Sequence, residues 1–455
     1  MSAATPLAPH ALPLLGHAPL LWRRPLTLLR ELNDGPELVR LRLGPVEAYL
    51  ARADAVTEVL NDPRTFDKGG PLFDKARLLV GDGLVSSDFA THRRQRRLVQ
   101  PAFTTSRLGG YAALMSEQIE AELATWRPGQ TFDLARAMHT LTLRVAARTM
   151  FGAQLDERAI ADVVAAMPMI MRGVYQRMIV PAEWVHRLPL PGNRQFEQAR
   201  ATMHRVIRQT VEAYRRSGVD HGDVLSILVR ADTDAPLRDE EIHDQVMTLL
   251  IGGTEPPGDA LTWVFHLLAG HPDTERAVHA EVDAVLGGAP AGLSHLPALE
   301  EVRRVVLEAL RLYPPAWLLS RAATRDTVLA GRPVPRGAIV LFSPYQGHHD
   351  PRVFPDPERF DPDRWRSPSP AARSAFLPFG AGNRKCVGDE VALTELAVTV
   401  ASVASRFRLR PAPGSVVRPQ PRASLSAGRV LMVAESRTAV RRPAAPRPAH
   451  PVVAP

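Results

Sequence analysis

The spacing of hydrophobic and polar residues divides the chain into three parts. Over residues 39–52 the two kinds alternate around a Gly-Pro turn, which predicts a β-hairpin. Over residues 91–310 apolar positions recur every three or four residues, the period of amphipathic helices. After residue 328 short apolar runs and turns return. The pattern predicts a mainly α fold with small β-sheets, and it lacks the strand–helix alternation of parallel α/β proteins.

Residues 66–87, FDKGGPLFDKARLLVGDGLVSS, interrupt the regular patterns with several glycines and no clear period. They predict a long irregular loop. A long ordered loop inside a globular protein usually has a functional role. We therefore expect this segment to line a functional site.

A second interruption falls inside the apolar helical pattern, in IGGTEPPGDALTW at residues 251–263. A proline within a helix removes one backbone hydrogen bond and clashes with the carbonyl four residues earlier, which costs about 3 kcal/mol or more. Pro256 and Pro257 would therefore leave the carbonyls of Gly252 and Gly253 without donors. The window alone fits either a loop between two shorter helices or a buried helix that is opened for a purpose.

Composition is that of an ordinary globular protein, with 45% hydrophobic and 23% charged residues in 455 positions. The apolar runs are too short for a membrane-spanning helix. Cys386 is the only cysteine, which excludes an intrachain disulfide and is typical of a cytoplasmic protein. We predict a proline-rich N-terminal segment over residues 1–20, one large domain over 21–438, and a disordered Arg/Pro-rich tail over 439–455.

The single cysteine lies in FLPFGAGNRKCVGDEVALTEL, residues 376–396. Glycines on both sides of Cys386 permit a tight turn and the close approach of a large flat group. An amphipathic helix is predicted directly after it, and free N–H groups at a helix start favour a thiolate over a thiol. The pattern predicts a thiolate presented to a metal or an electrophile.

This segment resembles the haem-binding loop of the cytochrome P-450 family, in which a cysteine thiolate binds the haem iron. The matching residues are Phe379, Gly380, Gly382, Arg384, Cys386 and Gly388. The resemblance spans about residues 12–438, and it implies the cytochrome P-450 fold with a single large haem-binding domain. It also implies haem b, iron protoporphyrin IX, as the cofactor, with Cys386 as the metal ligand and the other matching residues around it.

Two further segments resemble the family, EALR at residues 308–311 and PERF at residues 357–360. Taken alone, Glu308 and Arg311 predict an ordinary helical ion pair that contributes roughly 0.2–0.5 kcal/mol. In this order, ahead of the cysteine loop, the resemblance implies a structural network of Glu308, Arg311 and Arg359. Its expected role is folding and haem retention.

The segment HRRQRR, residues 92–97, is strongly basic. His92 and Arg96 are four residues apart, so they share one helix face and can bind the same anion. In the family this helix binds the haem propionates, and the resemblance implies that role for His92 and Arg96, and also for Arg321 and Arg384. Buried carboxylates need such cationic partners, because an unpaired buried charge is costly.

The remaining basic residues of this region are expected to form a docking surface. They are Arg93, Arg94, Arg97 and Lys385. On the proximal side of the haem they would steer an acidic electron carrier. The resemblance covers nearly the whole chain, so it implies separate ferredoxin and ferredoxin reductase partners. These roles account for the basic residues without nucleic acid, and no membrane partner is expected.

In the family the long central helix opens over the distal face of the haem at the pattern Ala/Gly-Gly-x-Asp/Glu-Thr. Gly252, Gly253, Thr254 and Glu255 match this pattern, whereas Pro256 stands in place of the threonine. The prolines would keep the groove, but the hydroxyl group is lost. Reduction of dioxygen needs two protons, and we predict that Glu255 and ordered water deliver them, with Thr254 as the weaker candidate. The alternative is that Glu255 is an ordinary ion-paired helix residue.

Apolar residues dominate the segments expected over the distal face, which predicts an apolar small-molecule substrate. These segments are residues 66–87, 167–184, 249–255, 314–320 and the turn around 426. HRRQRRLVQPAF and residues 177–196 are similar to soluble bacterial members that oxidise cyclic sesquiterpenes, which implies hydroxylation of a (sesqui)terpene. Two alternatives stay open, oxidation of a macrolide or fatty acid, and a peroxide-driven, isomerase-type or sensory haem-thiolate protein.

Overall fold

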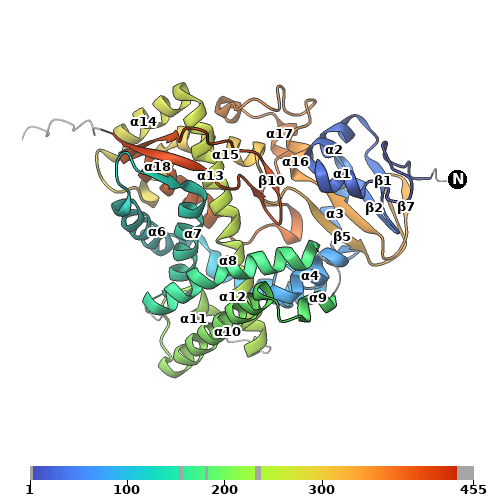
Figure 1. Cartoon of the computed structure of the whole chain (residues 1–455), viewed down its shortest axis with the longest axis horizontal. Helices are drawn as coiled ribbons and strands as arrows, with labels where there is room; N and C mark the ends of the chain where they lie inside the picture. The colour runs from blue at the N-terminus through green and yellow to red at the C-terminus, as the bar shows by residue number, and fades with distance from the viewer. Residues whose placement is uncertain (1–3, 153–156, 180–182, 231–236, 438–455) are drawn as a thin grey trace, which may run out of the picture.

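The computed structural model describes residues 4–152, 157–179, 183–230 and 237–437. Helices make up most of these residues, and the strands of the largest sheet lie toward one end of the molecule (Figure 1). The helices up to residue 217 are α1 (Ala18–Arg23), α2 (Pro25–Glu31), α3 (Asp54–Asn61), α4 (Pro71–Val80), α5 (Phe89–Val99), α6 (Thr105–Thr125), α7 (Leu134–Phe151), α8 (Glu157–Ile179), α9 (Glu183–Arg187) and α10 (Pro191–Ser217). Those that follow are α11 (Val224–Arg230), α12 (Asp239–Gly252), α13 (Glu255–Gly270), α14 (Pro272–Leu286), α15 (Glu300–Leu312), α16 (Pro344–His348), α17 (Pro370–Ala375) and α18 (Asp389–Arg406). Short 3-10 turns are η1 (Leu32–Asp34), η2 (Gln100–Phe103), η4 (Leu293–Ala298), η5 (Pro362–Trp365) and η6 (Gly382–Arg384).

The strands form four small sheets within the described residues. The five-stranded sheet has the order β1-β2-β8-β5-β3, and only its β2–β8 pair is parallel. Its strands are β1 (Leu38–Leu43), β2 (Val46–Ala51), β3 (Phe66–Asp67), β5 (Leu319–Ala323) and β8 (Ile339–Phe342). The other sheets are built from β4 (Thr131–Asp133), β12 (Leu431–Ser436) and β9 (Phe407–Pro411), from β6 (Thr327–Leu329) and β7 (Arg332–Val334), and from β10 (Gln420–Pro421) and β11 (Leu425–Ser426).

The hairpin predicted over residues 39–52 is confirmed as β1 and β2, whose residues pair in antiparallel register from Leu38–Ala51 to Leu43–Val46. At the opposite edge of the sheet, β3 pairs with β5 so that Asp67 lies beside Ala322. This pairing brings the segment after β3 next to Arg321, although about 250 residues separate them in sequence. The sheet therefore helps to assemble the site described below.

The prediction of an irregular loop over residues 66–87 is wrong for its central part, which forms α4. Gly70 has φ +83°, a conformation that a residue with a side chain rarely adopts, and Pro71 then occupies the first helical position. The glycines that suggested an irregular loop therefore mark the ends of a helix. Helix α4 packs against α8 and α12.

The central helical pattern is interrupted, as the prolines indicated, between α12 and α13. The two helices are separated only by Gly253 and Thr254, and both prolines fall in the first turn of α13, where an N–H group is not needed. The N–H of Gly253 donates to the Leu249 carbonyl at 2.8 Å. Helix α13 thus follows α12 almost directly, with a local opening between them and no separate loop.

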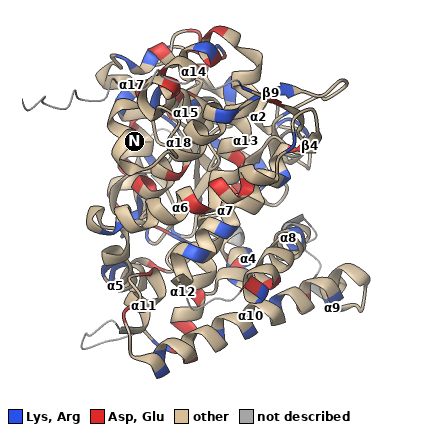
Figure 2. Cartoon of the chain, turned by 90° about the vertical axis from the view of Figure 1, so that its left-hand side faces the viewer, with Lys and Arg blue, Asp and Glu red and all other residues tan. Residues whose placement is uncertain are grey.

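The core lies around α13, which packs against α7, α15 and α18. Trp263 of α13 is fully buried and stacks on Tyr313, with ring centroids 3.8 Å apart. Its indole N–H donates to the carbonyl of Leu425 at 2.8 Å, which ties α13 to β11. Charged residues are instead spaced along outer helices such as α10 (Figure 2). The packing fixes α13, and with it the opening at its start.

Part of the predicted N-terminal segment lies against the sheet. The N–H of Ala8 donates to the Arg40 carbonyl at 2.9 Å, and the N–H of Arg40 donates to the Pro6 carbonyl at 2.8 Å. His17 is fully buried, and α1 begins directly after it. The predicted tail, residues 439–455, lies outside the described residues.

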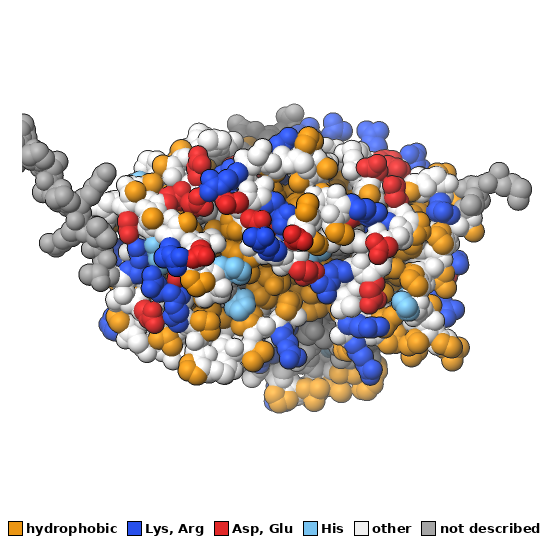
Figure 3. All heavy atoms as spheres, turned by 90° about the horizontal axis from the view of Figure 1, so that it is seen from above, with side chains coloured by type: hydrophobic (Ala, Val, Ile, Leu, Met, Phe, Trp, Pro, Cys, Tyr) orange, Lys and Arg blue, Asp and Glu red, His pale blue; other side chains and the backbone are white. Residues whose placement is uncertain are grey.

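Acidic and basic side chains are interspersed on the face that Figure 3 shows, and no single-sign patch covers it. In the part of the chain that the structure describes, no helix combines the length and the apolar character needed to cross a membrane.

Candidate active site

The cysteine loop is built from tight turns between α17 and α18. Gly380 and Gly382 both have φ +67°, which favours glycine. A Cβ atom on Gly382 would lie 2.5 Å from the carbonyl oxygen of Leu60, so a side chain there would displace α3. The N–H of Cys386 donates to the Phe379 carbonyl at 2.9 Å. The loop thus holds Cys386 in place just before α18 begins.

The Cys386 side chain is accessible, although protein surrounds it closely enough to change its acidity. Burial raises the pKa of its thiol, while the N–H of Gly388 and the charges of Arg96 and Lys385 act in the opposite direction. The sequence-based expectation that the helix start favours the thiolate is therefore outweighed by burial. A metal ion restores the thiolate, because a coordinating thiol loses its proton.

Basic side chains from three separate segments gather beside this loop. His92 and Arg96 come from α5, Arg321 from β5 and Lys68 from the end of β3, while Arg384 belongs to η6. Burial and the four neighbouring cations, with Arg384 foremost, lower the pKa of His92 to about 3. His92 is therefore a neutral hydrogen-bonding group among fixed positive charges.

Arg321 is the most isolated of these cations. The residue is 4% exposed, and its guanidinium donates to the carbonyl of Ser320 at 2.8 Å. Among the described residues no carboxylate forms an ion pair with it. Burial, followed by the charge of Arg384, lowers the pKa of Arg321 to about 10. An unpaired buried guanidinium is costly, so this position fits an anionic group.

The other cations of the cluster have protein partners. Arg384 pairs with Asp67 at 2.5 Å and donates to the Ser87 carbonyl at 2.9 Å. Arg96 donates to the carbonyl of Lys385 in the cysteine loop. Lys68 lies over the ring of Phe73, 4.4 Å from its centroid, and burial followed by Arg321 and Arg384 holds the pKa of Lys68 well below its usual value. Positive charge therefore exceeds negative charge around Arg321.

The opening between α12 and α13 is the part of the chain that was expected to face the distal side of a haem. Pro256 and Pro257 carry no N–H group, so neither can donate to the carbonyls of Gly252 and Gly253. Thr254 is buried, and its hydroxyl donates to the Leu250 carbonyl at 2.6 Å. Its proton is thus committed to the helix backbone.

Glu255 is the first residue of α13 and lies near His139 and Asp259. Burial raises the pKa of Glu255, His139 opposes this shift, and Asp259 adds to it. Glu255 therefore holds a proton more readily than an exposed glutamate does.

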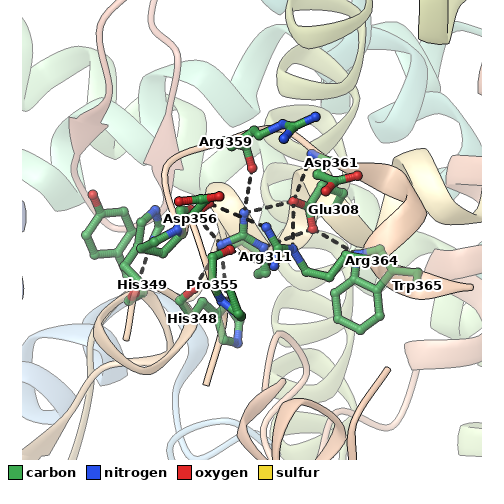
Figure 4. Close-up of polar contacts among 12 residues, drawn as sticks. Glu308, Arg311, His348, His349, Pro355, Asp356, Arg359, Asp361, Arg364 and Trp365 are labelled. Atoms are coloured by element: carbon green, nitrogen blue, oxygen red, sulfur yellow. Dashed lines mark hydrogen bonds and ion pairs between the residues drawn. The ribbon is translucent and has the colours of Figure 1, made fainter. Parts of the chain in front are cut away.

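Glu308 and Arg311 form the predicted ion pair, but the third arginine differs from the expectation (Figure 4). Arg359 contributes its backbone carbonyl, which accepts from Arg311 at 3.1 Å, and its side chain turns away from Glu308. The guanidinium near Glu308 is that of Arg364, at 3.4 Å, and Trp365 donates to Glu308 at 2.9 Å. The sequence could not distinguish two arginines five residues apart on one irregular segment.

Comparison with known proteins decides the family. The profile described as cytochrome P-450 matches residues 6–437. This chain belongs to the cytochrome P-450 family. The predicted fold, mainly α with small sheets in a single haem-binding domain, is confirmed: the solved haem domain of cytochrome P-450DA matches 97% of this chain and 100% of its own, with a TM-score of 0.86 and 26% identity.

Two relatives from Streptomyces species are named as oxygenases. Cyclooctat-9-en-7-ol 5-monooxygenase of Streptomyces melanosporofaciens is 46% identical over 439 residues, which are 95% of each chain. Pentalenene oxygenase of Streptomyces avermitilis is 38% identical over 90% of this chain and 93% of its own. With the family, these relatives identify the chain as a cytochrome P-450 monooxygenase.

A cytochrome P-450 carries a haem-thiolate group, and the residues of this chain fit one. Cys386 offers an accessible sulfur on a rigid loop. The unpaired charge of Arg321, with His92 beside it, fits a group that carries carboxylates. The structure thus brings together His92, Arg96, Arg321, Arg384 and Cys386, as the sequence predicted.

Sequence reasoning missed several residues of this cytochrome P-450. Asp67 and Lys68 lie in the segment that was interpreted as a loop, and only their position beside two glycines marked them. His139 and Asp259 carried no signal, because one is a lone histidine in a helical pattern and the other a lone aspartate on the opened helix. Their proximity to Glu255 depends on how α7 packs against α13.

Proposed function

We propose that this cytochrome P-450 hydroxylates a cyclic terpene, either an olefin or an alcohol derived from it, with haem b as its cofactor. The observation that carries the proposal is the full-length similarity to two relatives whose names specify cyclooctat-9-en-7-ol and pentalenene. The substrate named for the first relative is an alcohol, and the substrate named for the second is an alkene. The substrate of this chain is therefore expected to be a compact apolar skeleton with at most a few hydroxyl groups.

The distal segments support an apolar substrate. Helix α4 packs against both α8 and α12, and the N–H of Leu84 donates to the side chain of Gln245 in α12 at 3.1 Å. Leu249 and Ile251 of α12 are only partly buried, next to the opening. Such surfaces bind a hydrocarbon by excluding water, and their shape selects which carbon is oxidised.

The bound haem supplies the oxidising chemistry, which activates dioxygen and inserts one oxygen atom into a carbon–hydrogen bond. Cys386 would hold its iron, and Arg321 and His92 would bind its carboxylates. The opening at Gly252 and Gly253 leaves room on the distal side. Glu255, in place of the missing threonine hydroxyl, would pass protons from water into this opening.

Electrons are expected to come from a ferredoxin that docks on α5. Of the four basic residues predicted for docking, Arg94 pairs with Glu241 and Lys385 pairs with Asp389. Arg93 and Arg97 are exposed and lie four residues apart on α5, beside a surface hollow that they help to line. These two arginines can attract an acidic partner by electrostatic steering.

A binding titration tests the substrate class. The ferric protein is titrated with pentalenene, with cyclooctat-9-en-7-ol, with a saturated fatty acid and with a macrolide lactone, and displacement of the axial water is followed in the absorption spectrum. We expect saturable shifts with the terpenes and product formation with ferredoxin, its reductase and a nicotinamide donor. A shift confined to the fatty acid or macrolide, or turnover with peroxide alone, contradicts the proposal.

A further inference from the structure

Three titratable side chains meet where α7 packs against the first turns of α13. The Nε2 atom of His139, on α7, lies 3.5 Å from Oδ1 of Asp259 and 3.9 Å from Oε2 of Glu255. Glu255 and Asp259 are four residues apart, so they share one face of α13. The ligand-capable atoms of the three residues all lie within 4.8 Å of one another.

The protons of this cluster can be assigned from its contacts. Nδ1 of His139 lies 2.7 Å from the carbonyl oxygen of Ala135, and a carbonyl only accepts, so Nδ1 carries a proton. Nε2 is then the atom that faces both carboxylates. If it were unprotonated, its lone pair would face the Oδ1 atom of Asp259 without any proton between them.

Asp259 decides the charge of His139. Its side chain is 2% exposed, and its Oδ1 has no hydrogen-bond partner among the described residues. A buried carboxylate oxygen without a donor is costly, and Nε2 of His139 is the nitrogen placed to supply one. The geometry therefore favours a proton on both ring nitrogens, which makes His139 an imidazolium.

The position of His139 is also fixed by packing. A Cβ atom on Gly258 would lie 2.8 Å from Cδ2 of His139, so the ring rests directly on the backbone of α13. The hydroxyl of Thr142, one helical turn along α7, donates to the carbonyl of Thr254 at 2.9 Å. These contacts hold the imidazole at the opening between α12 and α13.

We propose that His139, kept as an imidazolium by Asp259, is a positioning residue that supplies protons to Glu255 during turnover. The proposal rests on the proposed proton-carrying role of Glu255. The Nε2–H bond of His139 breaks, its proton goes to the Glu255 carboxylate, and the neutral imidazole then takes a proton from water. The His139 side chain is 25% exposed, which gives it access to water. The 3.9 Å separation is longer than a hydrogen bond, so one water molecule or a small rotation of Glu255 completes the path.

The charged groups that act on Glu255 are His139 from α7 and Asp259 from its own helix. Burial raises the pKa of Glu255, which helps it to keep a proton received from His139 until the distal opening takes it. The three residues thus form a graded path, from water through His139 to Glu255.

The first test compares coupling, the product formed per nicotinamide oxidised, in the holoenzyme and four variants. Glu255→Gln and His139→Gln should both reduce coupling and release peroxide, His139→Gln by about tenfold, below the ~10²-fold effect typical of a direct acid catalyst. Their double variant should be no worse than Glu255→Gln alone, because both changes interrupt one path. Asp259→Asn should resemble His139→Gln and shift the pH dependence of coupling.

His271→Gln is the matched control. The Nδ1 atom of His271 also lies 2.7 Å from the carbonyl four residues earlier, that of Leu267, but no ion pair joins His271 to a carboxylate among the described residues. Its coupling should equal that of the native enzyme. Every variant should keep the substrate-induced spectral shift, which shows that the distal pocket is intact.

The second test measures charge directly and does not depend on turnover. In the diamagnetic ferrous carbon monoxide complex with ¹⁵N-labelled histidine, both ring nitrogens of His139 should be protonated at neutral pH, and Asp259→Asn should remove one proton.

A neutral His139 in the native protein overturns the proposal. So does normal coupling in His139→Gln while Glu255→Gln is uncoupled, an outcome that leaves the role of Glu255 standing. Normal coupling in both variants removes the role of Glu255 as well, whereas absence of any terpene product refutes the proposed function itself.

Discussion

Arg311 binds Glu308 through two nitrogen–oxygen contacts of 2.9 and 2.8 Å, and neither side chain has any exposed surface. Arg311 also donates to the carbonyls of His348 and Pro357, so one guanidinium joins α15 to two later segments. The segments that Arg311 joins precede the cysteine loop in the sequence.

Removal of one partner from this pair should destabilise the protein strongly. Glu308→Ala leaves the Arg311 guanidinium buried without its carboxylate, and we expect a loss of about 3–5 kcal/mol in the free energy of unfolding. Denaturant titration measures this loss. The control is Arg30→Ala, which breaks the pair of Arg30 with Glu358, whose side chains are 39% and 61% exposed. An exposed pair contributes at most about 1 kcal/mol, so equal losses in the two variants would contradict the interpretation.

Glu395 should make stability depend on pH. This residue of α18 is buried, its Oε1 has no hydrogen-bond partner among the described residues, and burial raises the pKa of its carboxyl well above the usual value. Since the folded state holds this proton more tightly than the unfolded state, the stability of the native protein falls as pH rises above the unfolded pKa. Glu395→Gln keeps a neutral group, so the stability of the native protein should fall relative to that of the variant as pH rises above the unfolded pKa of this carboxyl. Parallel pH profiles of the two proteins would refute this assignment.

Arg321→Met should have opposite effects with and without haem. The unliganded chain loses a buried unpaired charge, so its stability should stay the same or rise. The haem-loaded protein loses a charge-assisted hydrogen bond of about 1.5–3 kcal/mol, so haem transfer to a scavenger should be at least about tenfold faster. Arg325→Met, two residues beyond the strand and 70% exposed, serves as the control and should retain haem. Equal haem retention in both variants would remove Arg321 from the propionate site.

Charge reversal on α5 should slow electron transfer without changing substrate binding. The double variant Arg93→Glu and Arg97→Glu replaces two exposed cations, so reduction by an acidic ferredoxin should slow, most clearly at low salt. Stopped-flow reduction at several ionic strengths measures this rate. The double variant Arg208→Glu and Arg216→Glu, which reverses two exposed charges on α10, should leave it unchanged. A rate that is insensitive to both changes would place the docking surface elsewhere.

The features that could be predicted from the sequence are those that local chemistry determines. The turn of the β1–β2 hairpin, the break at Pro256 and Pro257, and the cysteine loop each depend on residues that are close in sequence. The pair of Glu308 and Arg311 is also local, since the two residues are one helical turn apart.

The features that could not be predicted depend on how distant segments pack. Asp67 reaches Arg384 only because β3 pairs with β5, and His139 meets Asp259 only because α7 lies against α13. Helix α4 was missed for a different reason: its flanking glycines resembled loop residues, although they only delimit the helix. The exchange of Arg359 for Arg364 follows from the irregular backbone between them, which carries no period from which side-chain direction can be inferred.

The gap between α12 and α13 is caused by the covalent structure of the chain, because the imide nitrogens of Pro256 and Pro257 have no hydrogen to donate. Neither substrate nor oxygen has to break these hydrogen bonds, and no bound molecule can restore them. These two hydrogen bonds are therefore absent in the empty and in the loaded protein alike.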